Sequence, residues 1–287
     1  MLAALGVVCR DSSCVQKLPY LSHHADIITR FVIRSDDNNE IPPILYLKMT
    51  SPLSKINGPI YSTWRWFQHA ILHYNTTFIG HSEDDVHHYM PTLISMLYLA
   101  KLKLGDRPIA IGAMEIFHYC TCTHKAHFFW SHYNQNKAYD CKKKNASGVY
   151  EGGRIFHSNT TEGSVIGPFP MLKGPLYFLS TFVVNRIINN AWVQKEWNAQ
   201  LLRTTGWAWD DVFVGMAMAM SNITDLTFVN AMNLYGESCR PYRKPVHHKP
   251  CPYNVHLIKS KVKDLHCSSI YSNSCANSRW SSCRLQL

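Results

Sequence analysis

Apolar runs separated by polar turns divide the first third of the chain into alternating strands and helices. Residues 27–34 (IITRFVIR) are apolar and β-branched and residues 35–39 are polar, so we predict a buried strand that ends at this turn. Residues 42–48 predict a second, shorter strand. Apolar side chains at helical spacing predict a helix over 61–74, and residues 77–80 predict a strand that runs into an acidic turn.

The next element is a helix over residues 91–104, predicted because Pro91 stands at its start and Gly105 follows its end. The resulting order of strand, helix, strand, acidic turn and helix is typical of a parallel α/β sheet. We therefore predict an α/β fold in which helices flank the sheet.

The rest of the chain has a weaker pattern. Residues 108–117 predict a strand, and residues 120–169, which are polar and rich in His and Gly, predict a long loop region with short strands. Long loops over a compact core often carry substrate contacts. Helical spacing returns over 181–197 and 210–220, whereas residues 268–287, rich in Cys and Ser, are expected to form a disulfide-held or disordered tail.

Composition narrows the class of protein. The chain has 287 residues, of which 46% are hydrophobic, and this is enough for one large α/β domain or two small ones. No apolar run reaches the roughly 18 residues that suggest a membrane-spanning helix. The apolar segment 1–8 has no basic region before it and is too short for a signal peptide, which fits a truncated gene product or a domain of a longer chain.

The charge balance is strongly basic. A formal net charge of +10 suits nucleic acid, anionic membranes or a small anionic substrate such as a nucleotide. The densest basic run, Lys142–Lys144, stands beside the polar segment 145–148 and is typical of a solvated loop rather than a nucleic-acid surface. We therefore expect no nucleic-acid partner.

The cysteines indicate an oxidising compartment. The chain has ten cysteines and no C-x-x-C pair, so disulfides are favoured over a zinc site. Their pairing stays open, because ten cysteines allow very many connectivities. Four N-x-S/T sequons agree with a secretory protein: Asn75, Asn145, Asn159 and Asn222.

Three successive acids, Glu83, Asp84 and Asp85, follow the strand predicted at 77–80. In an open α/β sheet, ligands bind at the carboxyl ends of the strands. Alternate side chains of an extended segment share a face, so Glu83 and Asp85 could hold a hard divalent cation that also binds phosphates. The alternative is a solvated turn or a helix cap, and the acidic triplet by itself favours that alternative.

A second acidic pair, Asp210 and Asp211, lies between aromatic residues at the start of the helix predicted over 210–220. One of these carboxylates could act as a general base that deprotonates a substrate hydroxyl. The alternative is simple capping of the helix, whose dipole favours negative charge at this end.

Three blocks resemble glycosyltransferase family 31, the β-1,3-galactosyltransferase and fringe group. Residues 66–86 resemble the family's tryptophan helix followed by a strand that ends in three acids and a Val. Residues 169–180 resemble its Pro- and Gly-containing turn before Tyr-Val-Leu-Ser, and residues 210–215 (DDVFVG) resemble its Glu-Asp-Val-Tyr-Val-Gly. The sequence departs from the family pattern at Glu83, where Asp is usual, and at His81, where Lys is common.

The resemblance implies a GT-A fold, a Rossmann-like mixed sheet flanked by helices. Residues 1–267 would form one domain, with a nucleotide-sugar half at about 25–110, an acceptor half at about 111–267, and a Cys/Ser-rich tail at 268–287. The implied reaction is inverting transfer of a hexose or N-acetylhexosamine, with galactose or GlcNAc favoured, from a UDP-sugar to a glycan, glycoprotein or glycolipid hydroxyl. The cofactor would be Mn²⁺ or Mg²⁺, the linkage β-1,3 and the compartment the Golgi lumen, with any membrane anchor outside this chain.

The resemblance also assigns roles to residues. Asp211 corresponds to the catalytic base, and Asp85 and Glu83 to metal ligands. His256 lies in a late segment, residues 253–260, that resembles the one supplying a metal-binding histidine, although a surface histidine is the equal alternative. The residues expected to contact substrate are Glu83, Asp84, Gly174, Tyr177, Trp209 and Asp210.

Two other functions remain open. A descendant of this family could keep the fold as a catalytically inactive glycan-binding or scaffold domain. A metal-dependent phosphohydrolase could use the same acids, but it would need additional His and Asp ligands for a two-metal site, and no H-x-D pattern supplies them.

Overall fold

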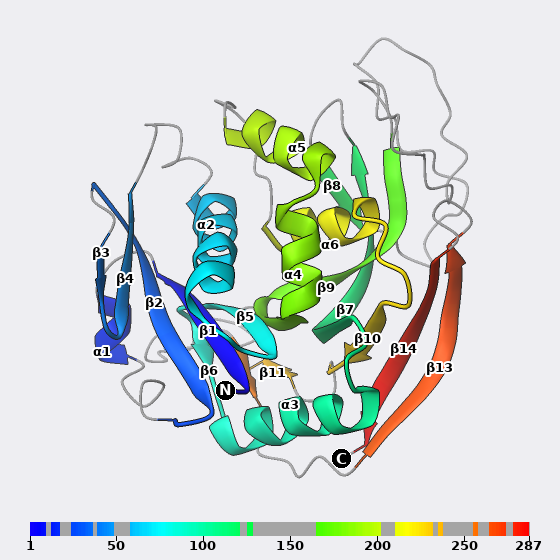
Figure 1. Cartoon of the computed structure of the whole chain (residues 1–287), viewed down its shortest axis with the longest axis horizontal. Coiled ribbons are helices and arrows are strands. Elements are labelled where there is room, and N and C mark those ends of the chain that lie inside the picture. The colour runs from blue at the N-terminus through cyan, green and yellow to red at the C-terminus, as the bar shows by residue number, and fades with distance from the viewer. Residues whose placement is uncertain are drawn as a thin grey trace, which may run out of the picture.

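A mixed β-sheet flanked by helices forms the body of the protein in the computed structural model (Figure 1). The structure describes residues 1–9, 13–17, 24–36, 39–48, 58–120, 125–128, 165–201, 210–231, 235–237, 255–257, 264–273 and 278–286. The main sheet has eleven strands, ten of them in the order β13-β14-β10-β7-β9-β5-β1-β2-β4-β3, with β8 paired to β7. The predicted α/β fold with a mixed, helix-flanked sheet is therefore confirmed.

The strands of the main sheet are β1 (Ala3–Cys9), β2 (Ile27–Ser35), β3 (Asn39–Ile41), β4 (Ile44–Lys48), β5 (Phe78–Glu83), β7 (Ile109–Cys120), β8 (Lys125–Phe128), β9 (Val165–Ser180), β10 (Thr227–Asn230), β13 (Asp264–Asn273) and β14 (Ser278–Gln286). A smaller sheet contains β6 (Val86–His87), β11 (Tyr235–Glu237) and β12 (Val255–Leu257). The helices are α1 (Ser13–Lys17), α2 (Gly58–His73), α3 (Met90–Leu104), α4 (Thr181–Ile188), α5 (Ala191–Leu201) and α6 (Asp210–Met220).

Parallel strands form the half of the sheet that begins the chain. Strand β1 pairs in parallel with β2 and β5, and β2 pairs in parallel with β4. The first residues of β1 are buried on both faces, as expected of a central strand that helices cover on both sides. The sequence assigned no element to residues 1–8, because a short apolar run without alternation does not distinguish a strand from a helix.

Strand β9 joins this parallel half to the rest of the sheet. It runs antiparallel to both β5 and β7, and its register sets Tyr177 opposite His81 and Leu176 opposite Ser82. The sequence predicts loops with short strands up to residue 169, and the family resemblance implies a turn within 169–180; Pro168, Pro170 and Pro175 interrupt the pattern of one long strand. The pairing brings the Gly174 region to the end of β5.

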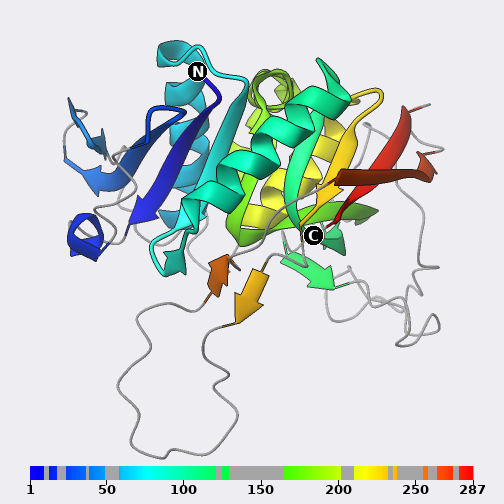
Figure 2. The ribbon, with the colours of Figure 1, turned by 90° about the horizontal axis from the view of Figure 1, so that it is seen from below.

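The two faces of the sheet carry different helices. Helices α2, α4 and α6 pack on one face around a core that includes Trp64, Phe67 and Phe213. Helix α3 packs on the other face through Leu93 and Leu97, and Figure 2 shows it from that side. No described helix is long and apolar enough to cross a membrane.

Local side-chain contacts explain where two helices are placed. On α2, the indole of Trp66 donates a hydrogen bond to the Gly80 carbonyl of β5 at 2.8 Å, which fixes the helix against the strand. The helix predicted over 181–197 is divided into α4 and α5, because the Asn190 side chain accepts from the Val193 N–H at 3.0 Å and so starts a new helix.

The segment expected as a tail, residues 268–287, differs from that expectation. Strand β14 pairs in parallel with β10, and β13 pairs with β14, so both belong to the main sheet. Cys283 is fully buried and disulfide-bonded, and Cys267 is its register partner on β13. The sequence of residues 268–287 does not predict these strands, because it has Ser and Cys where strands usually have β-branched and aromatic residues.

Candidate active site

A cavity of about 200 Å³ opens where β1, β2 and β5 end and where α2 and α6 begin. Its lining residues are Val8, Cys9, Arg34, Gly58, Pro59, Ser62, His81, Glu83, Asp84, Asp85 and Asp210. The carboxyl ends of parallel strands are the usual ligand-binding edge of an α/β sheet. All three acids of the turn at 83–85 therefore lie on one cavity together with Asp210.

Hydrogen bonds anchor the base of the acidic turn. Burial lowers the pKa of His88 to about 3, so its imidazole is neutral. His88 Nε2 lies 2.8 Å from Ser82 Oγ, and the Ser82 hydroxyl donates to the Pro175 carbonyl at 3.0 Å. These contacts attach the residues before and after the turn to β9, and the three acids between them line the cavity.

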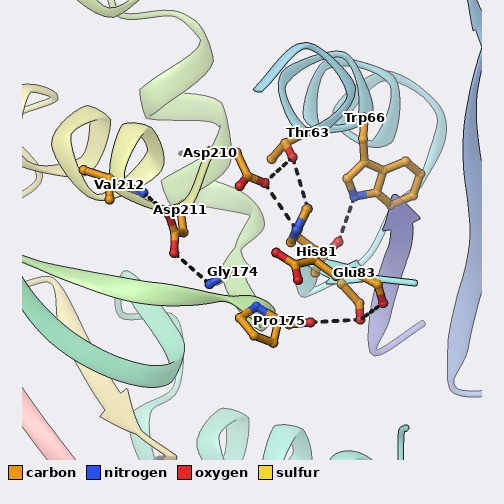
Figure 3. Close-up of polar contacts among 11 residues, drawn as sticks. Thr63, Trp66, His81, Glu83, Gly174, Pro175, Asp210, Asp211 and Val212 are labelled. Atoms are coloured by element: carbon orange, nitrogen blue, oxygen red, sulfur yellow. Dashed lines mark hydrogen bonds and ion pairs between the residues drawn. The ribbon is translucent and has the colours of Figure 1, made fainter. Parts of the chain in front are cut away.

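Asp210 is held by two buried side chains. The Thr63 hydroxyl donates to Asp210 Oδ2 at 2.8 Å, and His81 Nδ1 lies 3.2 Å from the same hydroxyl oxygen (Figure 3). Burial lowers the pKa of His81, although the charge of Asp210 acts in the opposite direction. Thr63 and His81 therefore fix the position of the Asp210 carboxyl group at the edge of the cavity.

Asp211 lies across Gly174 from Glu83. The Gly174 N–H donates to Asp211 Oδ2 at 3.0 Å, and the Val212 N–H donates to Asp211 Oδ1 at 2.7 Å (Figure 3). A Cβ atom at position 174 would lie 2.8 Å from Glu83 Oε1 and 3.4 Å from Asp211 Oδ2. A glycine is needed here because the two carboxylates occupy the space of a side chain, and the two acidic motifs meet at this point.

The carboxylates repel one another. Burial raises the pKa of Glu83 to about 8. Neighbouring carboxylates add to the increase: Asp210, Asp85, Asp211 and Asp84. Such a shift means that the ionised form of Glu83 lacks a compensating positive charge.

Asp211 is shifted in the same direction. Burial raises its pKa to about 7 and the charge of Asp210 contributes, whereas the two N–H groups of Gly174 and Val212 act to lower it. A carboxylate with a pKa near neutrality can take up a proton during a reaction and release it afterwards. Asp211 does not line the cavity directly, since Gly174 separates it from Glu83.

The acidic turn fits a hard divalent cation in charge and in donor type. Carboxylate oxygens are preferred by Mg²⁺ and Mn²⁺, and the raised pKa of Glu83 marks the negative charge that such an ion would offset. Across the described ranges, no three His, Cys, Asp or Glu side chains already form a metal cluster. This is compatible with the way Mg²⁺ binds, through one or two carboxylates together with waters and phosphates.

The other residues predicted for the site do not line the cavity or are not described in full. The backbone of His256 pairs with that of His87, two residues beyond Asp85, and nothing further is described of the His256 side chain. Trp209 lies outside the described residues. Tyr177 is completely buried and stacks on His81 with ring centroids 4.9 Å apart, and it is not among the residues that line the cavity.

Some residues of the site had no signal in the sequence. Thr63 contributes the hydroxyl that binds Asp210, but in the sequence it is one position within an apolar helix. Glu115 forms an ion pair of 2.6 Å with Lys173, and its charge also raises the pKa of Asp211. Only the pairing of β7 with β9 brings Glu115 to this position.

No protein-family profile matches this chain, and no curated protein is significantly similar to it. The resemblance to glycosyltransferase family 31 therefore depends on the three sequence blocks alone.

Proposed function

We propose that the protein is an inverting, metal-dependent glycosyltransferase of the secretory pathway. It would transfer a hexose or N-acetylhexosamine, with galactose or GlcNAc favoured, from a UDP-sugar to a glycan hydroxyl in a β-1,3 linkage. The observation that carries the proposal is the meeting of Glu83 and Asp211 across Gly174, because it joins two motifs that are far apart in the sequence. A chance resemblance would not require the two acids to converge.

The chain's own residues suggest the reaction steps. Asp85 and Glu83, with His256 as a further candidate, would hold the Mn²⁺ ion that offsets charge on a diphosphate leaving group. Asp211 would accept the proton of the acceptor hydroxyl while that oxygen bonds to the sugar's anomeric carbon and the bond to UDP breaks. The raised pKa of Asp211 suits this exchange, and Gly174 separates the base from the acids on the leaving-group side.

The disulfides support the compartment. Cys9 and Cys14 form a disulfide between the end of β1 and α1, and Cys283 is also disulfide-bonded. Disulfides persist in the secretory pathway and are rare in the reducing cytosol. A Golgi-type lumen is therefore the proposed location, and a glycoprotein or glycolipid is the proposed acceptor.

A donor screen tests the proposal. UDP-sugars are incubated with the protein, Mn²⁺ and candidate acceptor glycans, and both sugar transfer and UDP release are measured. We expect turnover of one UDP-sugar, loss of UDP binding when a chelator is added, and weaker UDP binding for Asp85→Asn. UDP affinity that is unchanged in the presence of chelator, or release of inorganic phosphate in place of UDP, would contradict the proposal.

A further inference from the structure

The cavity that holds the acids also has a group of residues suited to an anion. Arg34 stands near the end of β2, while Gly58 and Ser62 lie in the first turns of α2, and all three line the cavity. None of them belongs to the motifs that resemble glycosyltransferase family 31. The same 200 Å³ space therefore combines carboxylates with a guanidinium group and a helix N-terminus.

Arg34 lies directly over the start of α2. Its Nη1 atom is 1.9 Å from the position that a Cβ atom of Gly58 would occupy, and its Cζ atom is 2.5 Å from it. Any larger residue at position 58 would displace the guanidinium. Burial lowers the pKa of Arg34, but an arginine stays protonated in proteins, so a positive charge remains at this point.

Ser62 offers a hydroxyl that no group in the described part of the chain uses. Its side chain is completely buried, its Oγ atom has no hydrogen-bond partner among the described residues, and the residue lines the cavity. Buried polar atoms without partners are uncommon, and each one calls for an explanation such as a ligand or an ordered water. An oxygen atom of a ligand in the cavity would satisfy this hydroxyl.

The helix itself favours negative charge at this end. Helix α2 has 16 residues, and the backbone N–H groups of Gly58, Ile60 and Tyr61 in its first turn have no partners within the helix, whereas Pro59 has no N–H group. Together with the helix dipole, these groups make an N-terminus of this kind a binding site for phosphate groups. Arg34, Ser62 and the helix N-terminus thus point to the same type of ligand from three independent observations.

We propose that Arg34, Ser62 and the first turn of α2 form a diphosphate subsite, beside the acidic turn and distinct from it. The inference rests on the proposed function for its natural ligand, which is the diphosphate of a UDP-sugar. Because Glu83, Asp84 and Asp85 line the same cavity, an anion there needs a cation between itself and the carboxylates. Diphosphate and divalent cation therefore bind together, and each raises the affinity for the other.

Calorimetric titration of the full chain with inorganic pyrophosphate tests the subsite, with and without Mn²⁺. We expect Mn²⁺ to strengthen pyrophosphate binding at least tenfold, and Arg34→Gln to weaken it by about tenfold or more, the scale for a hydrogen bond to a charged group. Ser62→Ala removes a neutral hydrogen bond and is expected to weaken binding about threefold to tenfold. UDP and uridine are titrated in the same way. Comparison of UDP with uridine, which lacks the phosphates, isolates the contribution of the diphosphate, and comparison of UDP with pyrophosphate isolates that of the nucleoside.

Arg186→Gln is the matched control, because it removes the same charge from an exposed position on α4. It should bind pyrophosphate like the wild type. Thermal unfolding checks that each variant is folded. If Arg34→Gln does not fold, the pyrophosphate affinity of Ser62→Ala tests the subsite. Wild-type pyrophosphate affinity in a folded Arg34→Gln or Ser62→Ala variant overturns the subsite.

The two proposals can fail separately. If no UDP-sugar is turned over but pyrophosphate binding depends on Arg34 and Ser62, the proposed function is wrong and the diphosphate subsite stands. If a UDP-sugar is turned over and both variants bind pyrophosphate and UDP normally, the subsite is wrong and the proposed function stands.

Discussion

Two partly buried glutamates of this protein have opposite surroundings. Glu40 on β3 accepts hydrogen bonds from Arg30 and, at 2.7 Å, from the Tyr74 hydroxyl, and its Oε2 lies 3.2 Å from His69 Nε2. Burial acts to raise the pKa of Glu40, but the hydrogen bonds from Tyr74 and Arg30 and the positive charge of Arg30 lower it overall. The folded protein therefore stabilises the ionised form of Glu40 more than water does.

Glu83 is the opposite case. Burial raises its pKa to about 8, and the charges of four neighbouring acids add to the increase. The comparison shows that burial alone does not decide the role of a carboxylate. Where donors and a cation compensate the charge, the group stabilises the fold, and where other carboxylates surround it, the group is prepared for a positively charged ligand.

The largest expected effect comes from the second motif of the acidic site. Asp211→Asn should keep binding of UDP and Mn²⁺ but lose sugar transfer by about 10²-fold or more, the scale for removing a general base. Its stability should stay near that of the wild type, because the change removes a charge that its neighbours disfavour. Steady-state kinetics and UDP titration measure the two properties.

Asp210→Asn is the matched control for this experiment. Asp210 accepts from Thr63 and lies 3.3 Å from His81, so its loss should affect stability more than rate. Near wild-type transfer by Asp211→Asn would show that another acid is the base, and Glu115, whose charge raises the pKa of Asp211, would be the next to test.

The Glu40 network gives the second effect, which falls on stability. Glu40→Gln should lower the free energy of unfolding by about 1–2 kcal/mol, the lower part of the range for hydrogen bonds to charged groups. The low value is chosen because the Glu40 side chain is 26% exposed, which weakens the ion pair with Arg30. Urea unfolding measures the change.

Glu83→Gln is the corresponding variant on the other side of the comparison. In the presence of chelator it should leave the free energy of unfolding unchanged or raise it, because the substitution removes an uncompensated charge. The comparison fails if both variants are destabilised to the same extent, since the two carboxylates would then contribute alike to folding.

The sequence predicts the parallel half of the fold well. The apolar runs at 27–34 and 77–80 and the helices at 61–74 and 91–104 correspond to β2, β5, α2 and α3. These elements repeat a regular hydrophobic period and have clear start and stop residues. The strands at 3–9, 165–180, 264–273 and 278–286 lack such signals, because their residues are uninterruptedly apolar, interrupted by Pro, or rich in Ser and Cys.

The residues of the acidic site can be predicted only in part from the sequence, for a similar reason. The two acidic motifs stand out in a basic chain, so Glu83 and Asp211 can be selected from the sequence. Arg34, Ser62 and Thr63 reach the site through the pairing of strands and the position of α2, and no local pattern marks them. Contacts between distant segments depend on register, which hydrophobic periodicity specifies only within each element.

The final expected effect is a difference in the sign of two pH dependences, measured with chelator present. The pKa of Glu40 is lowered in the fold from its ordinary value of 4.5. Its stabilising contribution is therefore complete above about pH 4.5 and is lost as the pH falls through the lowered pKa. The stability advantage of the wild type over Glu40→Gln should shrink on acidification.

Glu83 should behave in the opposite way. Its pKa rises from 4.5 to about 8 in the fold, so the folded state binds the proton more tightly than the unfolded state. Relative to Glu83→Gln, the wild type should lose stability as the pH increases from about 4.5 to about 8, with a slope below about 1.4 kcal/mol per pH unit, the limit for one proton. Mn²⁺ should flatten this slope, because the bound cation takes the place of the proton. Denaturant unfolding of the wild type and both variants between pH 3 and pH 9 measures the slopes, and two slopes of the same sign would remove the contrast between the compensated and the uncompensated carboxylate.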